Sequence, residues 1–154
     1  MVPVPVVGEE GENDEGSGRS VTVGLSEEET RVLLTELPAV HRCEINDLLL
    51  AGLAEALVGW AGGPVLVEME GHGREDVVEG LDVTRTVGWF TTLYPVRLEA
   101  AGSPMATLEG VKATLRGVPG KGLGYGLLRY LGDGGALVGY PEPEVTFNYL
   151  GQFD

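Results

Sequence analysis

An amphipathic helix pattern that leads directly into a strand pattern is the feature that most constrains the fold of this sequence. Apolar residues recur at steps of three and four from Ile45 to Trp60, which predicts a helix with one apolar face. A Gly-Gly-Pro turn ends the helix, and residues 64–70 then read as a strand, with Val65, Val67 and Met69 on one face and Leu66, Glu68 and Glu70 on the other. Because the helix and the strand each have one face to bury, the pair favours an α/β fold.

The remaining periodicities extend this fold to a two-layer sandwich, a sheet covered by helices. Further strands are predicted over 20–25, 92–99 and 144–150, and further helices over 26–37 and 104–116. Pro38 is expected to stop the first of these helices, and residues 71–93 to form a long ordered loop. Residues 1–19, rich in Pro, Gly and acidic residues, are expected to be a flexible acidic linker, which leaves residues 20–154 as the folded part.

The charge balance narrows the possible partners. The sequence carries 24 Asp and Glu against 10 Lys and Arg, a formal net charge of −14. Ten cationic side chains cannot easily form a basic groove for a phosphate backbone. Neither nucleic acid nor an anionic membrane surface is therefore an expected partner. No apolar run is long enough to span a bilayer. The single cysteine, Cys43, excludes a disulfide within the chain, and these features together favour a cytoplasmic setting.

The segment EGHGRE, residues 70–75, concentrates groups that could move a proton. Glu70 ends a predicted strand, and glycines flank His72. Arg74 and Glu75 follow within the same turn. An acid, an imidazole and a guanidinium on a backbone freed by glycine suit proton transfer, although a surface turn whose charges pair with each other fits the same spacing. A metal site is not expected, because the two histidines and one cysteine stand in no zinc-ligand spacing.

Five strings, in order, resemble the signature motifs of epimerization domains in nonribosomal peptide synthetases. They are INDLLLAGLAEAL (45–57), EGHGRE (70–75), RTVGWFTTLYPV (85–96), GKGLGYGLLRYL (120–131) and FNYLGQFD (147–154). The resemblance covers essentially residues 20–154. EGHGRE and FNYLGQFD favour epimerization over the related condensation domains, whose sequences usually differ there.

The resemblance implies a fold of two chloramphenicol-acetyltransferase-like lobes with a tunnel between them, of which this chain would be the C-terminal half. It implies no intrinsic cofactor. A neighbouring peptidyl carrier domain would present an aminoacyl or peptidyl thioester on its phosphopantetheine arm, and the domain would convert the L form toward a mixture of L and D. Such chemistry needs acid/base groups on both sides of Cα.

The resemblance also assigns roles to individual residues. Glu70 would be one of the two acid/base groups. The other would come from an HHxxxDG motif in an N-terminal lobe, a motif that these 154 residues lack, so the chain alone is expected to be inactive. Tyr149 and Asn148 match active-site positions of the family, but neighbouring residues of a regular strand point to opposite faces, so both cannot line one cleft without a bulge. Tyr149 is favoured because its hydroxyl could donate to an enolate-like oxygen, and cross-strand packing is the alternative for each residue. Arg74 would orient Glu70 or pair with Glu75.

The remaining expectations concern the tunnel and two competing functions. His72, Trp89, Phe90 and Tyr94 are expected to line the substrate tunnel, with the lobe core as the alternative for the three aromatic residues. A non-catalytic remnant or carrier-docking module is a second hypothesis, which the absent histidine motif favours. A condensation-type, amide-forming domain is a third.

Overall fold

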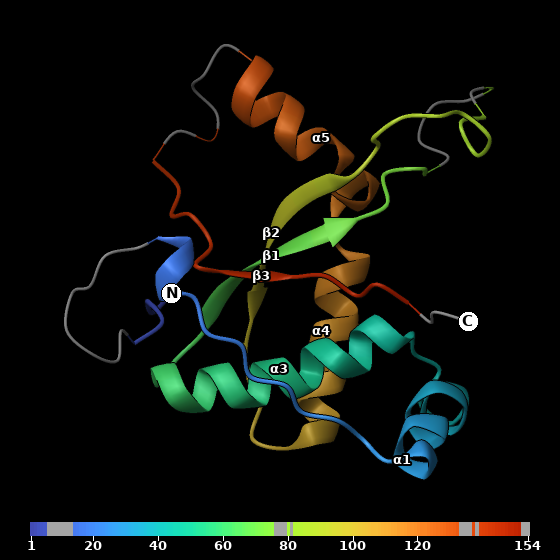
Figure 1. Cartoon of the computed structure of the whole chain (residues 1–154), viewed down its shortest axis with the longest axis vertical. Coiled ribbons are helices and arrows are strands. Elements are labelled where there is room, and N and C mark those ends of the chain that lie inside the picture. The colour runs from blue at the N-terminus through green and yellow to red at the C-terminus, as the bar shows by residue number, and fades with distance from the viewer. Residues whose placement is uncertain (6–13, 76–79, 81, 133–136, 138, 152–154) are drawn as a thin grey trace.

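The centre of the fold is a three-stranded sheet in the order β2-β1-β3 (Figure 1). The computed structural model of the chain describes residues 1–5, 14–75, 80, 82–132, 137 and 139–151. The strands are β1 (Val65–Gly71), β2 (Thr92–Leu98) and β3 (Val145–Phe147). Strand β2 runs antiparallel to β1, whereas β3 runs parallel to it. The strand that leads into EGHGRE is therefore the central one.

Two helices, α3 (Ile45–Ala61) and α4 (Pro104–Arg116), cover one face of the sheet. The alternation predicted for residues 64–70 is confirmed, since Val65, Val67 and Met69 are buried. The core that they form with β2 and the two helices also contains Cys43, Leu50, Ala51, Ala54, Val96, Leu98, Leu108 and Val111. The expected α/β two-layer arrangement is confirmed.

The opposite face of the sheet is much more open. Glu68 and Glu70 of β1 point to this face and are only partly buried. Leu93, the residue opposite Glu70 on β2, is 45% exposed, and Thr146 on β3 is exposed. Polar residues on the open face and apolar ones on the helix face are the pattern of a sheet packed on one side.

The first helical segment runs further than the sequence predicted. It begins as α1 (Glu27–Arg31) with the predicted capping box, in which Ser26 Oγ accepts from the Glu29 amide at 3.2 Å and Glu29 Oε2 accepts from the Ser26 amide at 2.8 Å. A wider turn of π type, η2 (Val32–Glu36), then leads into α2 (Leu37–His41). The prediction that Pro38 stops the helix is wrong. Pro38 lies in the first turn of α2. At that position the backbone N–H that proline lacks is not needed for a helical hydrogen bond.

The strand predicted over 20–25 is also wrong. These residues are extended, but no strand in the described part of the chain pairs with them, and Val21 and Val23 are 90% and 89% exposed. Alternation alone cannot form a strand without a partner for its backbone groups. The strand predicted over 144–150 forms only at Val145–Phe147.

The predicted linker, residues 1–19, is described at both of its ends. The Val2 amide donates to the Pro64 carbonyl at 2.9 Å, and Val4 packs against the core. A short 3-10 helix, η1 (Glu15–Ser17), is capped by Asp14. The remaining linker positions, 6–13, lie outside the described residues.

After α4 the chain passes through a tight turn to a second helical segment. The turn is η3 (Pro119–Gly122), and the segment consists of α5 (Leu123–Gly126) and η4 (Leu127–Leu131). Helix α5 packs beside β2, at one edge of the sheet (Figure 1). Among the helices that the structure describes, none is long and apolar enough to cross a membrane.

Candidate functional site

Glu70 lies at the end of the central strand, on the open face of the sheet. Its carboxylate has one hydrogen-bond donor among the described side chains: Asn148 Nδ2 donates to Glu70 Oε2 at 2.9 Å. Two residues earlier, on the same face of β1, Glu68 Oε2 accepts from Thr146 Oγ1 at 3.3 Å. Two carboxylates thus stand in a row on this face, each contacted from β3 or the residue after it.

The parallel register of β3 explains why Asn148 is the neighbour of Glu70. Met69 pairs with Phe147, so the next residue of each strand falls on the open face together. Sequence reasoning favoured Tyr149 over Asn148. Tyr149 follows one position later, is partly buried, and makes no hydrogen bond to Glu70 among the described residues. The structure therefore brings Asn148, and not Tyr149, into contact with the carboxylate.

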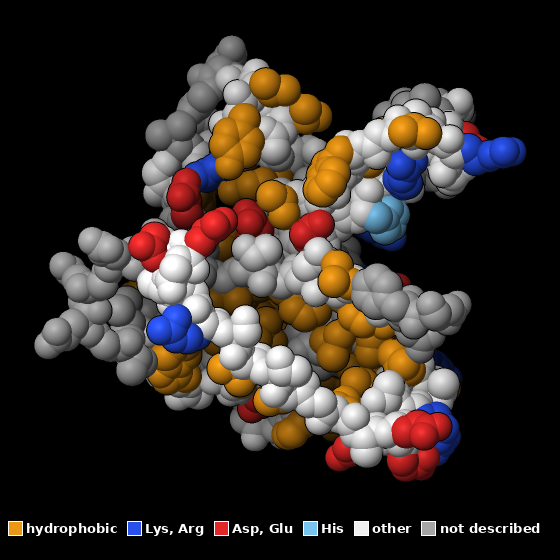
Figure 2. All heavy atoms as spheres, viewed as in Figure 1, with side chains coloured by type: hydrophobic (Ala, Val, Ile, Leu, Met, Phe, Trp, Pro, Cys, Tyr) orange, Lys and Arg blue, Asp and Glu red, His pale blue; other side chains and the backbone are white. Residues whose placement is uncertain are grey.

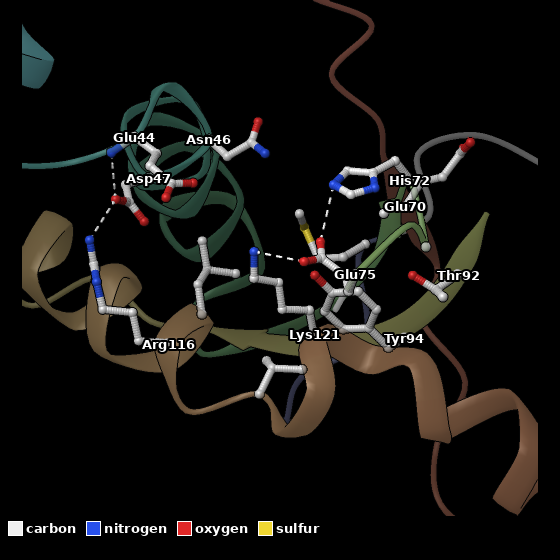
Figure 3. A pocket seen from close by; sticks show the side chains of 15 residues that line it. Glu44, Asn46, Asp47, Glu70, His72, Glu75, Thr92, Tyr94, Arg116 and Lys121 are labelled. Atoms are coloured by element: carbon white, nitrogen blue, oxygen red, sulfur yellow. Dashed lines mark hydrogen bonds and ion pairs between the residues drawn. The ribbon is translucent and has the colours of Figure 1, made fainter. Parts of the chain in front are cut away.

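A second cluster forms around Glu75, whose side chain is 19% exposed. His72 Nε2 lies 3.1 Å from Glu75 Oε1, and Lys121 Nζ lies 3.0 Å from Glu75 Oε2. Both side chains point at the carboxylate in Figure 3. The Arg74 amide donates to His72 Nδ1 at 3.0 Å, which leaves Nε2 as the nitrogen that carries the proton toward Glu75. The cluster ties the loop after β1 to the turn before α5.

The charge of Glu75 affects the pKa values of two neighbouring side chains, Lys121 and Tyr94. Its carboxylate, by hydrogen bond and by charge, raises the pKa of Lys121 above its ordinary value. Burial raises the pKa of Tyr94, and the Glu75 charge raises it further. Lys121 is therefore held as a cation and Tyr94 as a neutral phenol across the neutral pH range.

A cavity of about 410 Å³ lies between this cluster and the N-terminus of α3. At its far side Asp47, which is 3% exposed, accepts from the Glu44 amide at 2.8 Å and from an Arg116 guanidinium nitrogen at 3.3 Å. Glu70, His72 and Tyr94 line the cavity, and the expected role of His72 and Tyr94 in a substrate tunnel stays a prediction. Figure 3 shows the Asp47–Arg116 pair on one side of the cavity and the Glu75 cluster on the other.

Arg74 contacts neither of the carboxylates that the sequence suggested. Its guanidinium donates to the carbonyls of Val83 and Gly88 and lies 4.3 Å from the centre of the Phe90 ring. The loop folds back over Arg74, so the side chain satisfies loop carbonyls instead of carboxylates. The described residues thus show neither suggested contact, and a role for Arg74 in orienting Glu70 or pairing with Glu75 stays a prediction.

The two aromatic residues of this loop, Phe90 and Trp89, have different environments. Phe90 is partly buried under Arg74. Gly73, at φ 67°, comes so close to it that an added Cβ would lie 1.6 Å from the Phe90 carbonyl oxygen. Trp89 is 90% exposed. It is therefore not part of the lobe core within the described residues, and a role in the tunnel stays a prediction.

Sequence reasoning missed Lys121. The residue stands in a Gly-Lys-Gly turn at φ 48°, a conformation that non-glycine residues adopt rarely. The following Gly122, at φ 83°, packs flat on Tyr94. The flanking glycines were the available signal, but the contact between Lys121 and Glu75 depends on tertiary packing.

The site therefore presents one carboxylate, Glu70, at the end of β1 with a neutral amide donor from Asn148. Within the described residues no group of three side chains is arranged to hold a metal ion.

The condensation-domain family matches residues 2–154, nearly the whole chain. The chain belongs to this family.

Relatives of this condensation domain are peptide synthetases. A linear gramicidin synthase chain of Brevibacillus parabrevis is 49% identical over 151 residues, which cover 95% of this chain and 2% of the relative. Tyrocidine synthase 1 of the same organism is 43% identical over 144 residues, which cover 90% of this chain and 13% of the relative. The chain thus spans a small part of the proteins that it resembles.

Solved structures agree on the fold. The epimerization domain from the third module of tyrocidine synthetase B is 41% identical, with a TM-score of 0.75 over 84% of this chain and 30% of that one. The first condensation domain of the CDA synthetase is 24% identical, with a TM-score of 0.53 over 70% of this chain and 25% of that one. The two-layer sandwich is thus the fold of condensation-type domains.

Proposed function

We propose that this chain forms one wall of an epimerization site in a nonribosomal peptide synthetase, with Glu70 as an acid/base group. The observation that carries the proposal is the Glu70 carboxylate at the end of β1, on the open face of the sheet, with Asn148 Nδ2 2.9 Å from Oε2. The other Glu70 oxygen has no donor among the described side chains, so it is free to take a proton. The 41% identity to the tyrocidine synthetase epimerization domain supports the same function.

The substrate in this proposal is an aminoacyl or peptidyl thioester on the phosphopantetheine arm of a carrier domain. The Cα–H bond breaks and the proton goes to a Glu70 oxygen. The electron pair moves onto the thioester carbonyl oxygen and gives an enolate. Return of a proton to the opposite face of Cα gives the D form. For this step, the acid/base residue must lie within hydrogen-bond distance of the Cα proton that it removes.

The second acid/base group must approach Cα from the side opposite Glu70. His41 and His72 are the two histidines of the chain, and neither stands in an HHxxxDG motif. His72 Nε2 also faces Glu75 and not Glu70. We therefore assign the second group to an HHxxxDG histidine from a segment outside these 154 residues, acting in the same cytoplasmic synthetase.

The direct test starts from both configurations. The full-length protein that carries this chain is given a carrier domain loaded with an L-aminoacyl thioester and, separately, with the D form. An epimerase brings both to one common L/D ratio, read by chiral chromatography after hydrolysis. Retention of configuration in both samples, with an amide bond formed when a second loaded carrier is added, would establish the condensation alternative instead. Retention without amide formation would favour the non-catalytic docking module.

A further inference from the structure

A second hollow, distinct from the cavity beside Glu75, opens on the same sheet face as Glu70. It has a volume of about 400 Å³ and lies between the end of β2 and the α5–η4 segment. That size falls within the range of small-molecule sites. We call it the α5 groove, and its principal side chains are Phe90, Leu93, Leu123, Tyr125, Leu127 and Tyr130. Figure 2 shows hydrophobic side chains gathered over the α5 region, next to acidic ones.

The α5 groove lies one strand away from Glu70, whose own side chain lines the cavity beside Glu75. Leu93, which forms one wall, is the cross-strand partner of Glu70. Side chains directly opposite on antiparallel strands have Cβ atoms about 5 Å apart. Glu68, the next carboxylate on the same face, lines the groove as well. An atom held at Glu70 is therefore within one side chain's length of the groove.

The wall formed by the α5–η4 segment is held in place from two sides. At its start Gly122 lies flat on the Tyr94 ring, where an added Cβ would come within 2.0 Å of Tyr94 Cδ1. Further along, Arg129 donates to the Tyr125 hydroxyl at 3.3 Å and pairs with Glu142 at 2.5 Å. The Tyr125 ring is thus fixed before any ligand enters, which reduces the entropy lost on binding.

We propose that the α5 groove binds the side chain of the amino acid whose Cα faces Glu70, and that it selects apolar side chains. This inference rests on the proposed function and names its substrate class. Apolar walls favour an aliphatic or aromatic side chain, because burying a polar one without partners costs free energy. Glu68 in the groove lining, and Glu70 opposite Leu93 on the neighbouring strand, disfavour acidic side chains by like-charge repulsion.

Two neighbouring leucines give a matched test. Leu127 lines the groove and is 56% exposed, whereas Leu128 lies outside the groove lining and is 55% exposed. Leu127→Trp fills the groove, and Leu128→Trp adds the same bulk beside it. Each variant, in the full-length protein, is given carrier-bound L-alanyl, L-phenylalanyl and L-aspartyl thioesters in deuterated buffer, and exchange at Cα is followed by mass spectrometry.

The wild type is expected to exchange the phenylalanyl thioester at least about tenfold faster than the aspartyl one. Leu127→Trp should lower phenylalanyl exchange about tenfold or more and leave alanyl exchange within about twofold, while Leu128→Trp changes neither. Equal loss on alanyl and phenylalanyl substrates, no loss on either, or a wild-type preference for aspartyl would overturn the groove assignment while leaving Glu70 chemistry intact. No exchange of any substrate by the wild type would defeat the proposed function itself.

Discussion

At the scale of single residues, the proposed chemistry depends on one contact, between Glu70 and Asn148. A carboxylate that must take a proton from carbon needs a fixed position and one free oxygen. Asn148 provides the first through its Nδ2 contact of 2.9 Å to Oε2, because a neutral amide donor holds the carboxylate without neutralising it. Sequence reasoning found both residues but ranked Tyr149 above Asn148. That ranking rested on the Tyr149 hydroxyl as a donor to the enolate oxygen and stays a prediction, whereas the contact to Glu70 comes from Asn148, directly after the end of β3 at Phe147.

Asn148→Ala should therefore slow Cα exchange by about 10- to 100-fold, the kinetic equivalent of losing one hydrogen bond to a charged group. Thr146→Ala is the matched control, since Thr146 makes the equivalent contact to Glu68. Exchange in deuterated buffer measures both variants. Equal rates for the two variants would contradict a positioning role for Asn148.

At the scale of elements, the site depends on the turn before α5. Gly122 combines a φ of 83° with direct contact to the Tyr94 ring, so a side chain there is both strained and crowded. Gly124, two residues later in α5, has open space around its Cα and an ordinary φ. Substitutions at these two glycines therefore distinguish the need for a positive φ from the effect of helix propensity within one short segment.

Gly122→Ala should reduce the free energy of unfolding by at least about 2 kcal/mol, from backbone strain together with overpacking. Gly124→Ala should leave it unchanged or raise it by up to about 1 kcal/mol, since alanine favours a helix more than glycine does. Urea unfolding monitored by circular dichroism gives both values. A cost at Gly124 as large as that at Gly122 would contradict the turn geometry.

The ion pair between Lys121 and Glu75 predicts a dependence of stability on pH. Glu75 raises the pKa of folded Lys121, so the folded state holds that proton more tightly than the unfolded state does. The stabilisation is then fully present below the unfolded lysine pKa of about 10.4 and is lost as pH rises through the higher folded pKa. Because Lys121 is 70% exposed, its size is at most about 1 kcal/mol.

Lys121→Met should accordingly be less stable than the wild type at pH 7, and the two curves should converge at strongly alkaline pH. Urea unfolding at several pH values from 7 to 11.5 measures the difference. Lys112→Met serves as a comparison on another element. A Lys121→Met difference that is constant over the whole range would show that the ion pair adds nothing.

Local sequence patterns were sufficient to predict α3, β1, β2 and α4. Each of these elements buries one apolar face, and the spacing of its apolar residues in the sequence shows which face that is. They failed at Pro38, where a wider turn moves the proline to the start of a new helix, and at residues 20–25, where alternation found no partner strand among the described residues. The Glu75–Lys121 pair was out of reach for a related reason. It depends on how the loop after β1 meets the turn before α5, which no local pattern contains.

At the scale of the whole molecule, the chain offers a sheet with one covered and one open face. The helix face is the core, and the open face holds Glu70, Asn148 and the α5 groove. The chain covers 30% of the tyrocidine epimerization domain that it resembles. An active site that approaches Cα from both sides therefore needs groups from more than this one wall.

Residues 1–154 alone are thus expected to exchange no Cα proton above the uncatalysed rate. Addition of a separately produced segment containing HHxxxDG from the tyrocidine synthetase epimerization domain should restore exchange, because it supplies the opposite acid/base group. Carrier-bound phenylalanine in deuterated buffer is the substrate. Exchange by residues 1–154 without that addition would contradict the two-sided mechanism.

Whether Glu70 takes the proton is decided by two isosteric variants on the same strand. Glu70→Gln keeps the size of the side chain but removes the base, and Glu68→Gln does the same at the neighbouring carboxylate on the same face. Cα exchange is measured in the full-length protein with a loaded carrier. The proposed mechanism predicts a loss of at least about 100-fold for Glu70→Gln and a change within about threefold for Glu68→Gln. Exchange that survives Glu70→Gln, or falls equally in both variants, would contradict it.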